Sequence, residues 1–257
     1  AKLEAGSIGR LMAILAAATL ASLVTAWITA RLMRLPQEKK GAFIQGSFRG
    51  NGAFIGLPVI LYSAGSLHPE VEALATVMLA PLVVLFNILG VSVLLRYSRK
   101  KHGTAESVSA FFIQLMKNPL ILGCIIGFTL NLAGVPLPLF LFRSMDALGN
   151  AALPLILISI GASLTAAPLH GAATPSLIAS LLKVAVTPAI GFLLAGLIGL
   201  GTAERLIAVL YLGAPAAGMS YVMAEVMDND ATLAGRIVAL STLLSAITLP
   251  VIIALGL

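Results

Sequence analysis

The chain has 257 residues, of which 59% are hydrophobic and only 10% are charged, and it carries a formal net charge of +6. Because a soluble domain has about 25% charged residues, this composition excludes a water-soluble globular protein and predicts an exterior that faces lipid. The basic residues gather in short loops, which is typical of orientation signals in membrane proteins and argues against a nucleic-acid partner.

Apolar blocks of about 20 residues, the length that a helix needs to cross a bilayer, follow one another along the chain. They lack the alternation of a membrane barrel, so they predict an all-α integral membrane protein with a single membrane domain. The blocks place eight transmembrane helices at residues 8–32, 42–63, 71–95, 117–132, 144–164, 176–200, 205–223 and 233–257.

Two basic loops predict the orientation of these helices. Both should lie on the cytoplasmic side by the positive-inside rule, whereas the intervening loop SLHPEVE (66–72) has no Lys or Arg and should lie outside. We therefore expect a multi-pass protein of the cytoplasmic (inner) membrane. The loops contain Arg31, Arg34, Lys39 and Lys40, and Arg96, Arg99, Lys100 and Lys101.

An internal repeat relates the region 8–95 to the region 176–257. Each contains a long helix, a helix interrupted by Gly and Pro, a short acidic loop and a final apolar helix. The interrupted helices read GNGAFIGLPVILYSAG (50–65) and GAPAAGMSYVMAEVMD (213–228). Equivalent helices are five spans apart, an odd number, so they cross the membrane in opposite directions. Inverted repeats with interrupted helices are typical of alternating-access transporters.

The repeat predicts a boundary between residues 1–107 and residues 108–257. If the unit has five helices, the second copy is complete and the first is short by two. We therefore expect the eight spans to be helices 3–10 of a ten-helix transporter. The alternative is a natural eight-helix protein.

The interruptions predict a binding site. Glycine and proline weaken a helix, and unwound backbone at membrane depth must be buried or line a wet cavity. Two crossing breaks would present helix N-termini, whose free amides suit a carboxylate. The alternative is a pair of simple kinks. The breaks are predicted at Gly50, Gly52, Gly56 and Pro58, and at Gly213, Pro215 and Gly218.

Polar residues near the breaks are predicted to complete this substrate site. Asn51 can donate to an anion, and Ser220 follows the second break. Ser159 and Ser163 share one helix face, although each serine could instead bond its own helix backbone. Arg49 and Lys183 are candidates to balance the substrate's charge. Arg49 could alternatively extend to the cytoplasmic surface.

No catalytic constellation or metal-ligand motif is evident, which argues against an enzyme. His68, His102 and His170 fall in loops, and Cys124 stands alone inside a span. We expect no cofactor and no metal site. The coupling ion, H⁺ or Na⁺, stays open, with Glu225 and Asp146 as the acidic groups available for proton coupling.

Four segments carry a resemblance to the auxin efflux carrier family, which includes plant PIN proteins and bacterial malonate-type transporters. The resemblance implies ten helices in two inverted repeats, with helices four and nine crossing at the substrate site. It implies that Asn51 and Pro215 occupy the two crossover positions. Plant members carry a proline where this chain has Gly50, which argues against plant-type auxin specificity. The segments are RGNGAFIGLPVI (49–60), LGNAALPLILISIGASL (148–164), LLKVAVTPAIG (181–191) and LGAPAAGMSYVMAEVMDND (212–230).

The resemblance further implies a secondary transporter of small carboxylates such as malonate, malate, lactate or auxin-like acids. One alternative is a sodium-coupled symporter of the bile-acid type, which shares the architecture. Another is a membrane sensor that binds an organic anion without moving it. The predicted partners are a small carboxylate and the lipid bilayer, and a homodimer is left open.

Overall fold

The structure, a computed structural model, describes residues 5–65, 69–99, 137–149, 151 and 173–255, with the pairs 122–123, 126–127, 129–130 and 133–134. The chain forms two compact units, one from Ala1–Gly103 with Pro168–Leu257 and the other from Thr104–Ala167. In the second unit residues 139–149 are helical. Most of the spans predicted at 117–132 and 144–164, with Ser159 and Ser163, lie outside the described residues.

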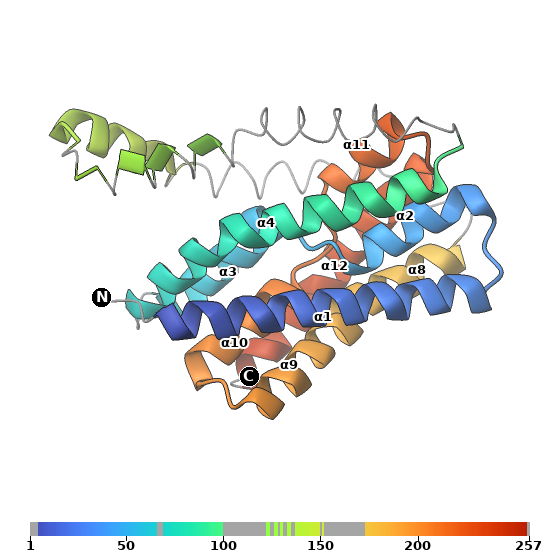
Figure 1. The fold of residues 1–257 in the computed structure, drawn as a ribbon, viewed down its shortest axis with the longest axis horizontal. Coiled ribbons are helices and arrows are strands. Elements are labelled where there is room, and N and C mark those ends of the chain that lie inside the picture. The colour runs from blue at the N-terminus through green and yellow to red at the C-terminus, as the bar shows by residue number, and fades with distance from the viewer. Residues whose placement is uncertain are drawn as a thin grey trace. The chain divides into compact units, whose positions relative to one another are not determined.

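The first unit is built of helices (Figure 1). Four helical stretches among the described residues are long and apolar enough to cross a membrane, namely 6–32, 70–97, 174–198 and 231–254. The predicted all-α membrane fold is therefore confirmed. The elements are α1 (Ala5–Leu32), α2 (Gln37–Phe48), η1 (Gly52–Gly56), α3 (Leu57–Ile60), η2 (Leu61–Gly65), α4 (Pro69–Tyr97), α8 (Ala173–Leu181), η3 (Leu182–Val186), α9 (Thr187–Ile198), α10 (Thr202–Gly213), α11 (Met219–Val226) and α12 (Ala231–Ala254).

Local chemistry explains several helix boundaries. Pro36 stands directly before α2, where its missing amide donor costs nothing. Gly199 ends α9 in the left-handed conformation with φ 68°, which glycine adopts without strain. The Asp230 carboxylate accepts the Leu233 amide at 2.8 Å and so caps α12. These signals fix where the chain reverses between membrane-crossing segments.

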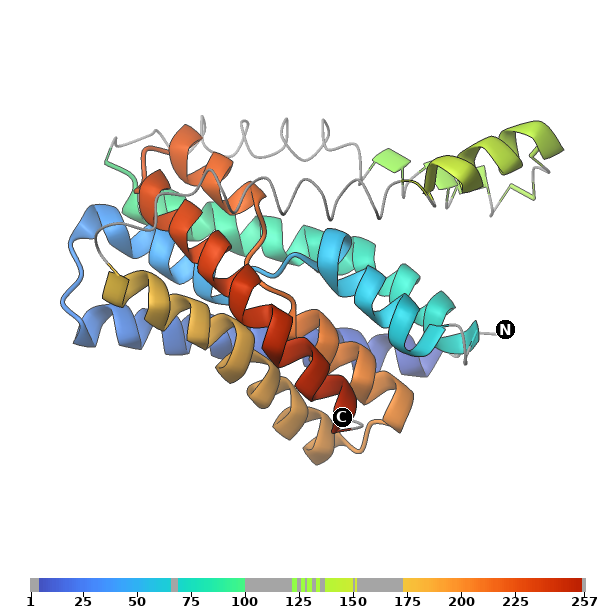
Figure 2. The ribbon, with the colours of Figure 1, turned by 180° about the vertical axis from the view of Figure 1, so that it is seen from behind.

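The core of the first unit forms around α2, which packs against α1, α4 and α12. The face of α1 that carries Leu11, Ile14 and Leu15 is fully buried. Behind it, α12 runs alongside α8 (Figure 2). This packing encloses the C-terminal end of α2 and the C-terminal end of α10, where the backbone stops being helical.

Several prolines lie in described helices that continue past them, among them Pro81 in α4 and Pro250 in α12, and two others come just after a π-helical turn. Pro58 follows the wide π-helical turn η1, and Pro188 follows η3. Because proline lacks an amide donor and crowds the preceding turn, a widened turn lets the helix pass it. The prediction that Gly56 and Pro58 break the helix is therefore wrong: the backbone stays helical from residue 52 to residue 65, and the interruption lies before it.

Candidate functional site

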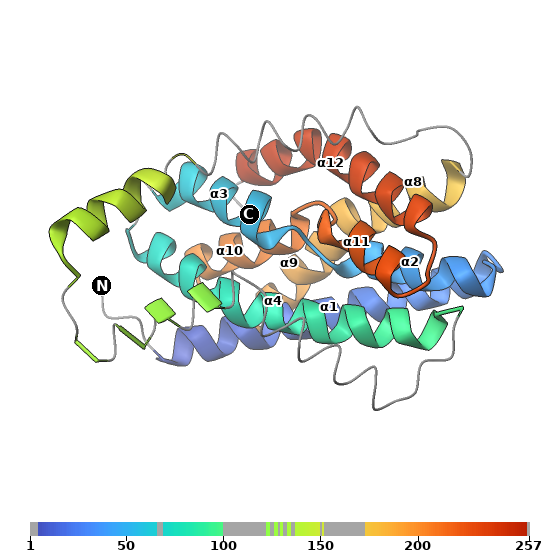
Figure 3. The same ribbon diagram turned by 90° about the horizontal axis from the view of Figure 1, so that it is seen from above.

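Two short non-helical links meet inside the first unit. Residues 49–51 connect α2 to η1, and residues 214–218 connect α10 to α11. Gly50 and Ala216 form an antiparallel bridge. The Asn51 amide donates to the Pro215 carbonyl at 2.7 Å, and the Ala217 amide donates to the Arg49 carbonyl at 3.2 Å. Figure 3 shows the two links beside each other. We call this pairing of the two links the crossing.

Gly50 permits this close approach because it has no side chain. A Cβ at Gly50 would lie 3.3 Å from the Tyr211 carbonyl oxygen and 3.3 Å from Lys183 Nζ. Gly56 meets a similar restriction, since a Cβ there would lie 3.0 Å from Tyr211 Cδ1. By contrast, Gly218 has an ordinary helical φ of −55° and nothing within 4 Å of a Cβ. Gly50 in the first link and Gly56 in η1 thus both allow close contact with Tyr211 of α10.

Asn51 closes the first link. Its side-chain Oδ1 accepts the Phe54 amide at 3.2 Å, which caps η1. Within the described structure its Nδ2 group has no acceptor. The amides of Gly52 and Ala53, the first of η1, have no acceptor in their own helix. Asn51 is half-buried, so this end of η1 offers several donors at a partly open position.

The second link takes its hydrogen bonds from other helices. Ser241 on α12 accepts the Ala216 amide at 3.0 Å. Lys183 on η3 donates from Nζ to the Leu212 carbonyl, at the end of α10. Ser220 is buried, and its hydroxyl has no partner among the described residues. Ser220 therefore does not use its hydroxyl to bond its own helix backbone.

Two buried cations lie at the crossing. Lys183 is fully buried beside Gly50, and Arg49 is only 6% exposed. Arg49 donates to the Asn87 side-chain oxygen at 2.8 Å and to the Met223 sulfur. The Arg49 side chain does not extend to the surface, so the alternative that it reaches the cytoplasmic side is wrong. In the described part of the chain neither cation forms an ion pair with a carboxylate. Their charges are thus compensated only by neutral groups, and an anion is the expected complement.

Several residues of this site escape prediction from sequence. Asn87 binds Arg49, and the Tyr211 hydroxyl donates to the Ala75 carbonyl at 2.6 Å. Ser241 supports the second link, and Gln45 is buried with Oε1 unpartnered among the described residues. Asn87 is the one with a readable signal, because an amide in the middle of a long apolar helix is costly without a partner.

The predicted site residues are partly brought together. The crossing unites Gly50, Asn51, Gly52 and Pro215, with Arg49 and Lys183 beside it. Gly213 is buried at the end of α10. Ser220 is the second residue of α11, directly after the second link. Glu225 is exposed on α11, and Asp146 belongs to the second unit.

An all-helical membrane bundle in which two interrupted helices meet beside buried cations defines a membrane protein of the transport class. A comparison with protein families agrees: the model of the membrane transport protein family matches residues 8–253. The chain belongs to this family, so the predicted membership of the auxin efflux carrier family is confirmed. The family is one of transporters and not of enzymes.

One curated relative supports the assignment. An uncharacterized transporter of Methanocaldococcus jannaschii is 29% identical to this chain over 221 residues. The aligned region covers 85% of this chain and 69% of that transporter. The match therefore extends across most of both proteins.

Proposed function

We propose that the protein is a secondary active transporter of small organic anions, mono- or dicarboxylates such as malonate, malate, lactate or auxin-like acids. The observation that carries the proposal is the pair of buried cations, Arg49 and Lys183, that have no carboxylate partner in the described structure. A buried charge without a counter-charge is costly. A substrate anion bound at the crossing would supply that counter-charge.

The donors at the crossing suit a carboxylate. The Asn51 amide group and the first amides of η1 would hold its oxygens, as helix N-termini hold anions. The unpartnered Ser220 hydroxyl would add a further donor. Lys183 would balance the charge from beside Gly50. A carboxylate accepts several such bonds at once, whereas a neutral substrate would leave the cations uncompensated.

Alternating access would proceed by rocking one helix bundle against the other in an inverted-repeat fold, with the substrate held at the crossing. The paired links bear on this mechanism. Because the two backbone hydrogen bonds of the Gly50–Ala216 bridge join them, they can stay together as a hinge while the outer ends of the helices move. H⁺ or Na⁺ would drive uptake or export.

Counterflow of labelled malonate, malate and lactate in proteoliposomes tests the proposal, using the full-length protein. Asn51→Asp would retain the helix cap but repel an anion, so we expect the apparent affinity to fall at least tenfold with little change in stability. Asn51→Ala would lose both the cap and the donor. Unchanged affinity and rate in both variants would remove Asn51 from the site.

The same assay separates the alternatives. Binding of an acid without counterflow would indicate a sensor and overturn the transport proposal. Sodium-dependent counterflow of bile acids, with none of the small acids, would instead identify a bile-acid-type symporter. Counterflow of a small carboxylate, with or without a sodium gradient, supports the proposal.

A further inference from the structure

A second concentration of positive charge lies at one end of the first unit, away from the crossing. A pocket of about 300 Å³ opens between α1, α2 and α4. Its position on α2 is near residue 40, nine residues and thus about 14 Å along the helix from Arg49. The pocket is lined by Trp27, Ala30, Arg31, Gln37, Lys40, Arg96 and Tyr97.

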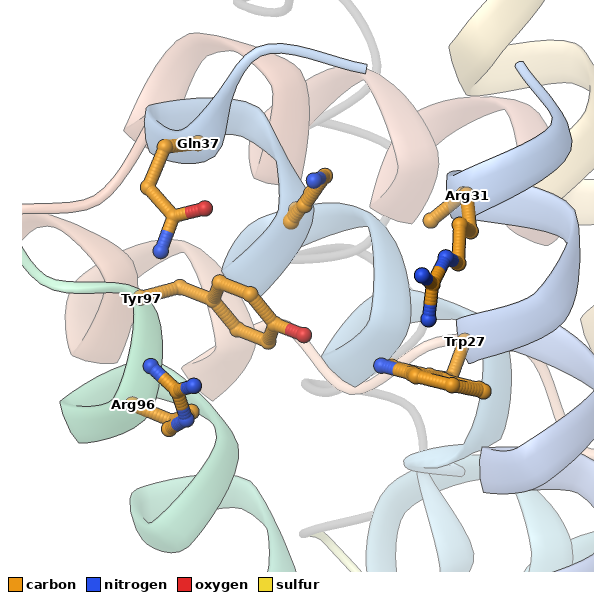
Figure 4. A pocket seen from close by; sticks show the side chains of 7 residues that line it. Trp27, Arg31, Gln37, Arg96 and Tyr97 are labelled. Atoms are coloured by element: carbon orange, nitrogen blue, oxygen red, sulfur yellow. The ribbon is translucent and has the colours of Figure 1, made fainter. Parts of the chain in front are cut away.

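Three cations converge on this pocket from three helices. Arg31 comes from α1 and Arg96 from α4 (Figure 4), and Lys40 comes from α2. None of the three forms an ion pair in the described part of the chain, where the ion pair found joins Arg10 to Glu204. No acidic side chain lines the pocket. Like charges that line one pocket repel each other unless an anion lies between them.

Aromatic rings hold the two arginines in place. The Arg31 guanidinium lies 5.4 Å from the centre of the Trp27 ring, and that of Arg96 lies 5.8 Å from the centre of the Tyr97 ring. Such cation–π contacts orient a guanidinium while leaving its N–H donors free. These contacts favour one orientation of the two exposed arginines, which reduces the cost of ordering them on binding.

We infer that this pocket binds a phosphate group, and specifically the head group of an anionic phospholipid. Arginine pairs match the geometry of phosphate oxygens. Trp27 is 41% exposed, and Trp and Tyr favour the depth of the lipid head groups. Gln37 adds a neutral donor for a head-group hydroxyl. Basic pockets between membrane helices on the cytoplasmic side suit anionic head groups, because that leaflet is negatively charged.

The convergence distinguishes this pocket from a simple orientation signal. A positive-inside signal needs only basic residues in the loops and no shared geometry. Arg34 and Arg99 belong to the same two basic segments but do not line the pocket. They therefore provide a matched control, because removing them changes the net charge and the loop charge by the same amount.

The test uses the purified full chain in a neutral detergent. Thermal stabilisation is titrated with dioctanoyl phosphatidylglycerol, dioctanoyl phosphatidylcholine, glycerol 3-phosphate and inorganic phosphate. The wild-type protein should bind phosphatidylglycerol at least tenfold more tightly than phosphatidylcholine. The double variant Arg31→Gln/Arg96→Gln should lose about 25-fold in this affinity, since each arginine that lines the pocket would lose a charge-assisted hydrogen bond to the phosphate. Arg34→Gln/Arg99→Gln should bind within about twofold of wild type.

The phosphate arms distinguish the source of the ligand. Weak binding of glycerol 3-phosphate and inorganic phosphate supports the lipid. Equal binding of the water-soluble phosphates, lost in Arg31→Gln/Arg96→Gln, keeps the phosphate site but overturns the lipid as its ligand. If that double variant binds phosphatidylglycerol like wild type, or if both double variants lose it equally, the site itself is refuted. Native mass spectrometry of retained lipids gives an independent reading if the variant is less stable.

Discussion

The two interruptions of the first unit solve the same problem in different ways. Each leaves backbone donors unpaired in the middle of a buried bundle, where they must find partners. The first link, residues 49–51, caps itself through Asn51 and needs Gly50 only for space. In the second link, residues 214–218, Ala216 bonds Ser241 of α12, and Lys183 of η3 bonds the Leu212 carbonyl just before the link.

The first link is stabilised by contacts that are local in sequence, and the second by tertiary contacts. The first link carries its own cap, so its geometry is encoded within a few residues. The second contains Pro215, which has no amide donor, and is stabilised by Ser241 of α12. We therefore expect the second link to respond to changes in the helices around it, and the first to respond mainly to changes within itself.

The largest effect on transport is expected from removing Lys183, the lysine that lies between the first link and the end of α10. Lys183 lies beside Gly50 and donates to the Leu212 carbonyl. In Lys183→Met we expect transport to fall about 100-fold, because losing one partner of a buried charge–anion pair costs several kcal/mol. Stability should change little, since an apolar side chain of similar size avoids burying a charge. Initial rates of uptake and thermal unfolding in detergent measure the two effects.

A matched control is Lys39→Met, which removes one lysine near the end of α2 that does not approach the crossing. Its transport should stay within about twofold of wild type, because Lys39 lies in the first turn of α2, about 15 Å along the helix from Arg49. If Lys183→Met transports normally, the lysine is only a structural partner of α10. The assigned role in charge balance is then wrong.

Sequence alone could locate the interruptions but not what supports them. Gly50, Asn51 and Pro215 are readable because their effects on the backbone are local. Ser241 is not, and Asn87 indicates only that some partner must exist, because packing alone decides which group a hydroxyl or amide on a long apolar helix meets. Pro58 shows the reverse error: proline alone suggests a break, but the π turn before it keeps the helix continuous.

The same reasoning applies to the basic pocket. The sequence indicates two basic loops and their side of the membrane. Whether their cations diverge into water or converge on one pocket depends on how α1, α2 and α4 pack. A three-helix arrangement of this kind leaves no trace in residue spacing. The inverted repeat, in turn, stays a prediction from the order of features.

The next prediction compares a methyl group added within the first link, at Gly50, with one added at Gly213, the last residue of α10 before the second link. Gly50→Ala should lower the free energy of unfolding by about 2–3 kcal/mol, because the new Cβ would press on backbone, the Tyr211 carbonyl, at 3.3 Å. Gly213→Ala should cost less than about 1 kcal/mol. Its Cβ would meet the Ile252 Cδ1 atom at 3.0 Å, the end of a flexible side chain that can move. Chemical unfolding in micelles should rank the two variants, and the opposite order would refute the close-approach role of Gly50.

A smaller effect should reveal the external support of the second link. Ser241→Ala leaves the Ala216 amide buried without its acceptor, which should cost about 1–2 kcal/mol. Ser245→Ala, one turn further along α12, removes a hydroxyl that bonds only the Thr242 carbonyl of its own helix, so it should cost less than about 0.5 kcal/mol. Equal losses in the two variants would show that the second link does not rely on α12.

The smallest expected effect has the opposite sign and concerns the end of the second link. Gly218 adopts φ −55° and ψ −33°, which every residue can adopt, and no atom lies within 4 Å of a Cβ there. Gly218→Ala should therefore stabilise the protein by about 0.4–1 kcal/mol by restricting the unfolded chain. If thermal unfolding shows a loss instead, the second link must visit a conformation that only glycine allows. The flexibility would then belong to the movement of the helices and not to the state described by this structure.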